Sequence, residues 1–172
     1  MNRRNIFQGA MVAAMLCPFC ADAAPPQSNV LGELNFRFDS SRLPGDATRK
    51  LDAAVAYAAS NPSARIVLDA HCDPRGTSAY NVGLAIRRAE AVRDRLTGAG
   101  VPREQIVLAI YGEDGAKRET YAEDRRVTVW SSRASMATLV DQTFAGRGAA
   151  VTWGRPLTVS QIEARPEAVA RR

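Results

Sequence analysis

The amino-acid sequence predicts an α+β domain in which two helices pack on one face of a small mixed four-stranded sheet. Four short segments are apolar or alternate apolar with polar residues, and two longer segments carry apolar residues at every third or fourth position. They follow one another in the order β-α-β-α-β-β. Strands separated by helices are usually parallel neighbours, because a crossover helix packs back onto the sheet. A chain of 172 residues can bury one ordinary core, so we expect one domain with an appendage.

The first strand and the first helix are separated by a proline-glycine break. In the stretch LNFRFDS, Leu34, Phe36 and Phe38 alternate with polar residues, which is typical of a half-buried strand whose apolar side chains share one face. After the break, Asp46 can cap a helix whose apolar positions recur every three or four residues. Asn61 and the proline after it end this helix.

Three more strands and one more helix follow. ARIVLDAH, residues 64–71, predicts the second strand, and the loop CDPRGT comes directly after it. Thr77 or Ser78 can cap the second helix, which carries one apolar stripe until glycine and proline stop it. The third and fourth strands are expected at residues 105–111 and 125–132.

The N-terminus has the three parts of a secretory signal peptide. MNRRN is basic, the next stretch is apolar but too short to span a bilayer, and ADA supplies small residues for cleavage after residue 23. We therefore expect a signal peptide at 1–23, a polar leader at 24–31 and a periplasmic protein, which could associate with the outer membrane. A lipid anchor on Cys17 or Cys20 is less favoured, because a large residue precedes each cysteine.

The C-terminal residues 133–172 are predicted to be a basic extension. The formal net charge of the chain is +5, and most of the excess that remains after signal removal lies in this segment. AAVTWGRPLTV could form one more short strand or a turn, and the polar end after it could be mobile. No basic helix face is present, so nucleic acid is not an expected partner, and no segment after the signal is apolar enough to span a membrane.

The sequence offers little for catalysis. His71 is the only histidine, and Cys72 is the only thiol left after signal removal, so no internal disulfide can form. On a strand these two adjacent side chains point to opposite faces and cannot share a proton. They also lack a second ligand cluster for zinc. We expect His71 to be a strand-end residue bonded to backbone, and we expect no enzyme activity, no metal and no cofactor.

Polar side chains gather where the second strand meets the second helix. Asp73 follows the strand, and Asn81 and Arg88 lie two turns apart on one face of the helix. Asp39, after the first strand, could reach the same edge. An aspartate and an arginine together complement an amino-acid head group, because the carboxylate accepts from an ammonium and the guanidinium donates to a carboxylate. An internal Asp73–Arg88 ion pair, or two solvated charges, would also explain the pattern.

Three stretches resemble a known family. FRFDSSRL, AHCDPRGTSAYNVGLAIRRAEAV and DRRVTV are similar, in this order, to blocks of the OmpA-like C-terminal domain, and DPRGTSAYN is most similar to the peptidoglycan-associated lipoproteins within it. The resemblance covers residues 32–132. It implies a β-α-β-α-β-β fold that binds peptidoglycan non-covalently by gripping the free amino-acid end of diaminopimelate in the stem peptide. The residues that it implies for this ligand are Asp73, Arg88, Asn81, Asp39 and Arg125.

The sequence also departs from the pattern of that family. Cys72 stands where the family usually has threonine or alanine, and Asp124 stands where it usually has asparagine. The segment from Gly112 to Asp124 is shorter than usual and lacks its proline. Asp124 could therefore engage Arg125 and take it away from a ligand.

Taken together, these features predict a peptidoglycan-binding domain that tethers the cell envelope to the wall. One alternative is a periplasmic module that keeps the fold but binds another envelope protein. A second alternative is a thiol-dependent envelope enzyme centred on Cys72, which would need an exposed thiol of lowered pKa.

Overall fold

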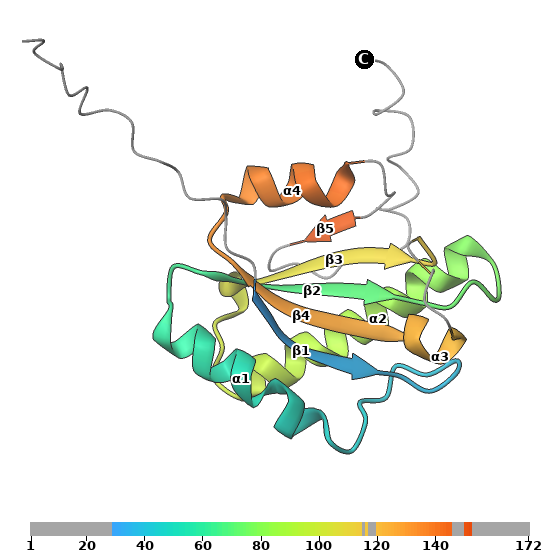
Figure 1. Cartoon of the computed structure of the whole chain (residues 1–172), viewed down its shortest axis with the longest axis horizontal. Helices are drawn as coiled ribbons and strands as arrows, with labels where there is room; N and C mark the ends of the chain where they lie inside the picture. Colours follow the sequence, from blue (N-terminus) through green and yellow to red (C-terminus); the bar gives the residue numbers. More distant parts are fainter. Residues whose placement is uncertain (1–28, 115, 117–119, 146–149, 153–172) are drawn as a thin grey trace, which may run out of the picture.

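The computed structural model describes residues 29–114, 116, 120–145 and 150–152 (Figure 1). Its elements are five strands, four α-helices and one short 3-10 helix. The strands are β1 (Asn29–Asn35), β2 (Arg65–His71), β3 (Ile106–Gly112), β4 (Arg126–Ser132) and β5 (Ala150–Thr152). The helices are α1 (Ala47–Ser60), α2 (Ser78–Gly98), η1 (Arg103–Gln105), α3 (Tyr121–Asp124) and α4 (Met136–Phe144). The signal peptide expected at 1–23 lies outside the described residues.

The sheet has the strand order β1-β4-β2-β3-β5. β2 and β3 pair in parallel, whereas β4 is antiparallel to both β1 and β2. The strands β1, β2 and β3 therefore run in one direction, and their carboxyl ends meet the start of β4 at one edge of the sheet. This is the edge where the sequence predicts converging polar side chains.

Both long helices pack on one face of the sheet, as the sequence predicts. Their apolar stripes and the inward residues of β1–β4 form one buried cluster that includes Leu51 of α1, Val92 of α2 and Ile66 of β2. β1 approaches α1 closely at Gly32, where a Cβ atom would lie 2.5 Å from the carbonyl oxygen of Lys50. The α+β class and the two-helix layer are thus confirmed.

The first strand differs from the prediction in its position. β1 begins at Asn29, inside the segment expected to be a polar leader, and it ends at Asn35. Phe36 is buried, but the chain then turns at Asp39, whose φ of 51° is left-handed. Phe38 is consequently 61% exposed instead of facing the core. The alternation in LNFRFDS therefore predicted one buried residue too many.

The C-terminal segment extends the predicted four-stranded sheet to five strands. β5, within AAVTW, pairs antiparallel with the edge of β3. Leu139 of α4 is buried against Val67, Val107 and Ala109, which point away from α1 and α2 because side chains alternate along a strand. Helix α4 is therefore packed on the second face of the sheet and β5 extends its edge, so the expected extension is partly built into the domain. No helix within the described residues combines the length and apolar character needed to cross a membrane.

Cys72 lies in the main core just beyond β2. It is buried in the same cluster as Ile66, Leu68 and Ala70, which agrees with its strand parity. Burial raises the pKa of the thiol to about 11. The group is therefore protonated at neutral pH and is not an activated nucleophile.

Alkylation tests this environment of Cys72. We expect iodoacetamide to leave the folded, signal-free protein unmodified at neutral pH, because the thiol is both buried and protonated, and to modify it fully after denaturation. Intact mass measures both reactions. Rapid modification of the folded protein would contradict the buried position and revive the thiol-enzyme alternative.

The packing of α4 predicts a stability effect. Leu139→Ala should lower the free energy of unfolding by about 2–4 kcal/mol, because it leaves a cavity between α4 and the sheet. Gln142→Ala, at an exposed position of the same helix, is the matched control and should change little. Thermal or urea unfolding measures the difference, and equal effects of both substitutions would show that α4 is not part of the core.

Candidate functional site

A pocket of about 180 Å³ opens at the edge where β1, β2 and β3 end. We call it the strand-end pocket. Its lining includes all five side chains that the sequence singled out, which are Asp39, Asp73, Asn81, Arg88 and Arg125. They come from the turn after β1, the loop after β2, the helix α2 and the junction of α3 with β4. The fold therefore brings residues from four separate parts of the sequence to one place.

Asp73 is the most heavily hydrogen-bonded acid of the pocket. It lies in the loop between β2 and α2, where Gly76 has a φ of 102° that other residues rarely adopt. Its side-chain oxygens accept from the backbone N of Arg75 at 3.2 Å, from Nε and Nη2 of Arg75 at 3.0 and 2.8 Å, and from Nη1 of Arg125 at 3.2 Å. The hydrogen bonds from Arg75 hold the pKa of Asp73 below its ordinary value.

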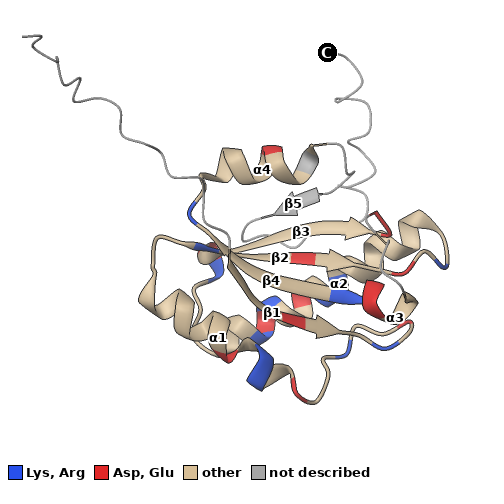
Figure 2. Cartoon of the chain, viewed as in Figure 1, with Lys and Arg blue, Asp and Glu red and all other residues tan. Residues whose placement is uncertain are grey.

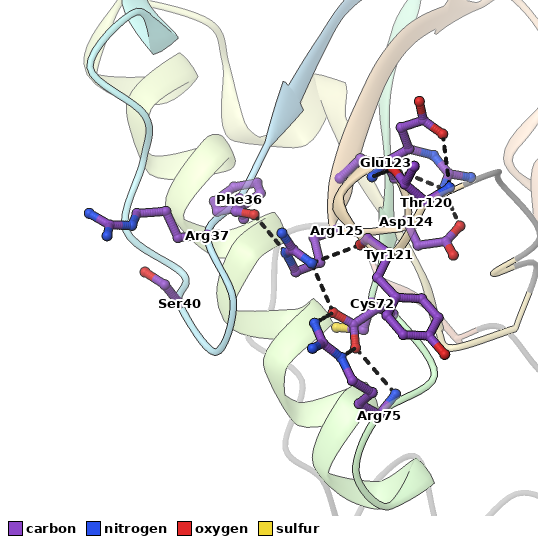
Figure 3. Close-up of polar contacts among 12 residues, drawn as sticks. Phe36, Arg37, Ser40, Cys72, Arg75, Thr120, Tyr121, Glu123, Asp124 and Arg125 are labelled. Atoms are coloured by element: carbon purple, nitrogen blue, oxygen red, sulfur yellow. Dashed lines mark hydrogen bonds and ion pairs between the residues drawn. The ribbon is translucent and has the colours of Figure 1, made fainter.

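Arg125 lies just before β4 and is fixed by the main-chain carbonyls of Phe36 and Tyr121 (Figure 3). Its Nε donates to the carbonyl of Phe36 at 3.0 Å, and its Nη1 donates to the carbonyl of Tyr121 at 2.9 Å. Asp124 forms an ion pair with Arg126 at 3.5 Å, whereas Arg125 pairs with Asp73 at 3.2 Å. The departure from the family pattern at Asp124 therefore leaves Arg125 directed into the pocket.

The helix α3 that precedes Arg125 is a single turn closed by a capping box. The hydroxyl of Thr120 accepts from the backbone N–H of Glu123, and the Glu123 carboxylate accepts from the backbone N–H of Thr120. Figure 2 shows acidic and basic residues side by side where α3 meets the start of β4. The capping box holds α3 in place, and Arg125 follows this helix directly, so its backbone position is fixed at the pocket.

Arg88 is fully buried, and its guanidinium group binds main-chain carbonyls. Nε donates to the carbonyl of Ser40 at 2.9 Å, Nη1 to the carbonyl of His71 at 3.1 Å, and Nη2 to the carbonyl of Arg37 at 3.2 Å. Nη1 also lies 3.3 Å from Sγ of Cys72. Burial lowers the pKa of Arg88, yet a guanidinium group remains charged in proteins.

This arrangement differs from the internal ion pair and from the solvated charge that the sequence left open for Arg88. The ion pairs of Asp73 within the described residues are formed with Arg75 and Arg125, so the internal Asp73–Arg88 pair is absent there. Three of the five N–H groups of Arg88 already donate to carbonyl oxygens, so its guanidinium does not have all of them available for a ligand carboxylate. Arg87, one position earlier, is exposed as expected.

Asp39 and Asn81 complete the wall formed by the turn after β1 and the start of α2. The hydroxyl group of Tyr80 donates a hydrogen bond to Asp39, and this bond raises the pKa of Tyr80. The side-chain amide of Asn81 donates to a carboxylate oxygen of Glu113 at 2.5 Å, and its backbone carbonyl accepts from Sγ of Cys72 at 3.2 Å. Thr77 caps α2 through Tyr80 N, as one of the two predicted caps.

His71 does not belong to the chemistry of the pocket. Its ring stacks on Tyr111 with 4.7 Å between centroids, and its Nδ1 lies 3.2 Å from the carbonyl oxygen of Asp114. The predicted contact with backbone is thus confirmed. Within the described residues, no group of three or more His, Cys, Asp or Glu side chains is placed to hold a metal ion.

Sequence reasoning missed the side chains at the mouth of the pocket. Arg75 lies between two aromatic rings, with its guanidinium carbon 4.2 Å from the centroid of Phe38 and 4.9 Å from that of Tyr121. Phe38, Tyr80 and Tyr121 are three exposed large hydrophobic residues gathered around one opening. The signal for Arg75 was its place two residues after Asp73 in a tight loop, but nothing local indicated the contact with Tyr121.

The charges of the pocket have both signs. Asp39 and Asp73 supply two carboxylates, while Arg75, Arg88 and Arg125 supply three guanidinium groups. Such a mixture favours a ligand group that is itself zwitterionic or carries separate positive and negative ends, because each ligand charge then meets its opposite. The pocket offers recognition by charge and hydrogen bonding, and its thiol is protonated.

The fold is similar to those of two solved structures. The crystal structure of the peptidoglycan-associated lipoprotein from Burkholderia pseudomallei aligns with a TM-score of 0.52 and 30% sequence identity, over 58% of this chain and 89% of that chain. The OmpA-like domain of FopA1 from Francisella tularensis aligns with a TM-score of 0.50 and 19% identity, over 58% of this chain and 70% of that chain. The second match supports the fold alone.

Sequence relatives agree with the structural ones. The peptidoglycan-associated lipoprotein of Haemophilus influenzae is 34% identical over 99 residues, which cover 55% of this chain and 65% of that protein. The peptidoglycan-associated lipoprotein of Rhizobium meliloti is 33% identical over 126 residues, which cover 70% of this chain and 69% of that protein. The match thus spans slightly less than two thirds of the Haemophilus protein. A sequence model of the OmpA family matches residues 35–128, more than half of the 172 residues, and the chain therefore belongs to the OmpA family.

Proposed function

We propose that this protein binds peptidoglycan non-covalently and tethers the cell envelope to the wall from the periplasm. The observation that supports this most strongly is the convergence of Asp73 with several arginines in one pocket of an OmpA-family domain. Its relatives from Haemophilus and Rhizobium are peptidoglycan-associated lipoproteins, which supports the same function. Association with the outer membrane would follow from the same role.

The proposed ligand is the free amino-acid end of diaminopimelate in the stem peptide. This end carries an ammonium and a carboxylate on one carbon. Asp73 is assigned to the ammonium, because it is the buried carboxylate of the pocket and remains ionised at neutral pH. Arg125 and Arg88 supply the positive charge that the ligand carboxylate requires, and Asn81 and Asp39 supply further hydrogen bonds.

Arg88 has a second task in this proposal. Its bonds to the carbonyls of Arg37 and Ser40 hold the turn after β1, and its bond to the carbonyl of His71 holds the end of β2. The turn carries Asp39, and β2 leads into Asp73. Arg88 therefore fixes the distance between two walls of the pocket while adding its own charge to it.

Asp73→Asn tests the ammonium contact. We expect this change to weaken binding to purified peptidoglycan sacculi by about tenfold to a hundredfold, because a neutral amide cannot offset the ammonium charge. Asp52→Asn removes an exposed carboxylate on α1 and is the matched control. Co-sedimentation of the purified, signal-free chain measures binding, and a thermal melt of each variant checks folding. A folded Asp73→Asn variant that binds like the parent would remove the proposed site.

Arg88→Lys tests the dependence on a planar guanidinium. A lysine keeps the charge but cannot reach three separate carbonyl oxygens, so we expect weaker sacculus binding, by about tenfold or more, together with a lower melting temperature. Arg87→Lys is the matched control on the next, exposed position and should leave both quantities unchanged. Arg88→Lys with full affinity and stability would contradict both tasks assigned to Arg88.

Sacculus binding also separates the proposal from its main alternative. A folded parent chain that does not sediment with sacculi would favour the module that binds another envelope protein. In that case the exposed aromatic residues around the strand-end pocket would be the first surface to substitute.

A further inference from the structure

We propose that Arg75 is an internal occupant of the pocket, whose guanidinium holds the place on Asp73 that the ammonium of a ligand takes in the complex. Binding then requires Arg75 to swing out into solvent. This inference rests on the proposed function for the identity of the natural ligand, and it adds a displacement step and a determinant of affinity. The site itself is a cation site formed by Asp73, Phe38 and Tyr121.

The first argument is the saturation of Asp73. A carboxylate offers about four acceptor positions. Four N–H contacts already use them, three from Arg75 and one from Arg125, at 2.8 to 3.2 Å. A ligand ammonium needs at least one strong bond to the same oxygens. It therefore cannot be added to this arrangement, and one of the present donors has to leave.

The second argument identifies the donor that leaves. Arg125 is also held by two main-chain carbonyls, and its side chain is only 15% exposed. The side chain of Arg75 is 44% exposed, and within the described residues its N–H groups bind Asp73 alone. Arg75 can thus move into water without leaving a buried carbonyl unsatisfied, whereas Arg125 cannot. Figure 3 shows the two arginines approaching from different elements, Arg75 from the loop after β2.

The third argument is the pair of rings around the guanidinium. Phe38 and Tyr121 contact Arg75 from the turn after β1 and from α3, at 4.2 and 4.9 Å from their centroids. Aromatic faces attract cations in general, and not only guanidinium groups. When Arg75 leaves, the same rings and the same carboxylate remain as a site for another cation. An alkylammonium fits the chemistry of that site.

The consequence is a competition inside the protein. The apparent affinity for a ligand is the intrinsic affinity multiplied by the fraction of molecules in which Arg75 has left the site. A neutral ligand is a poor replacement for the guanidinium, because the largely buried Asp73 would lose one of its two ion pairs and keep only the one with Arg125. Arg75 therefore disfavours uncharged groups and lowers the affinity for charged ones.

The experiment uses Arg75→Ala and Arg75→Gln in the full signal-free chain. NMR titration follows the backbone amides of the loop after β2 with two probes, free meso-diaminopimelate and methylguanidinium. We expect both variants to bind diaminopimelate about threefold to thirtyfold more tightly than the parent, because the internal competitor is gone. Arg75→Ala should also bind methylguanidinium, which the parent should not, and adding Asp73→Asn should abolish this binding. Arg87→Ala, which removes an arginine over Tyr80 at the rim, is the matched control and should match the parent.

The outcomes distinguish the inference from the function on which it rests. If the parent binds diaminopimelate, weaker or unchanged binding by folded Arg75→Ala and Arg75→Gln would overturn the inference, because Arg75 would then contact the ligand or have no role. Failure of Arg75→Ala to take methylguanidinium would overturn it too. If no variant binds diaminopimelate but Arg75→Ala binds methylguanidinium through Asp73, the internal-occupant assignment stands and the diaminopimelate function fails.

Discussion

The arrangement of the strand-end pocket depends on one buried cation, the guanidinium of Arg88. A charge without solvent contact is costly unless its N–H groups meet acceptors, and here the acceptors are carbonyls of Arg37, Ser40 and His71. Arg88 and the loops that supply these carbonyls stabilise each other. The arginine is held in place by the loops, and the loops are held in place by the arginine, so the turn after β1 and the end of β2 keep a fixed separation.

The remaining features of the pocket follow from that separation. The turn after β1 closes with Asp39 in a left-handed conformation, which an aspartate tolerates better than most residues and which the bond from Tyr80 supports. The same turn exposes Phe38 toward Arg75. On the other wall, Cys72 lies between the helix and the strand as a protonated, buried thiol. The uncharged thiol of Cys72 fills the space beside Arg88 and adds no negative charge there.

The far face of the sheet is stabilised by a separate segment. Val67, Val107 and Ala109 would be exposed on a sheet covered by α1 and α2 alone, and α4 covers them through Leu139. β5 meanwhile pairs with part of the outer edge of β3, so the edge strand on this side is a short one. The packing of β2 and β3, from whose ends Asp73 and Glu113 project, therefore depends partly on a helix on the face of the sheet opposite α1 and α2.

The order of the elements, the two-helix layer and the grouping of Asp73, Asn81 and Arg88 could all be predicted from the amino-acid sequence. These features depend on periodicity and on spacing within one strand, one loop and one helix, which are local properties. Other features depend on how the elements pack: the ion pairs of Asp73 with Arg75 and Arg125, the carbonyl partners of Arg88, the outward side chain of Phe38 and the addition of α4 and β5 to the sheet. The partners in these contacts are mostly far apart along the chain, for example 52 residues between Asp73 and Arg125 and 48 between Ser40 and Arg88. Which donor reaches which acceptor is then set by the packing of several elements at once, and no local pattern contains that information.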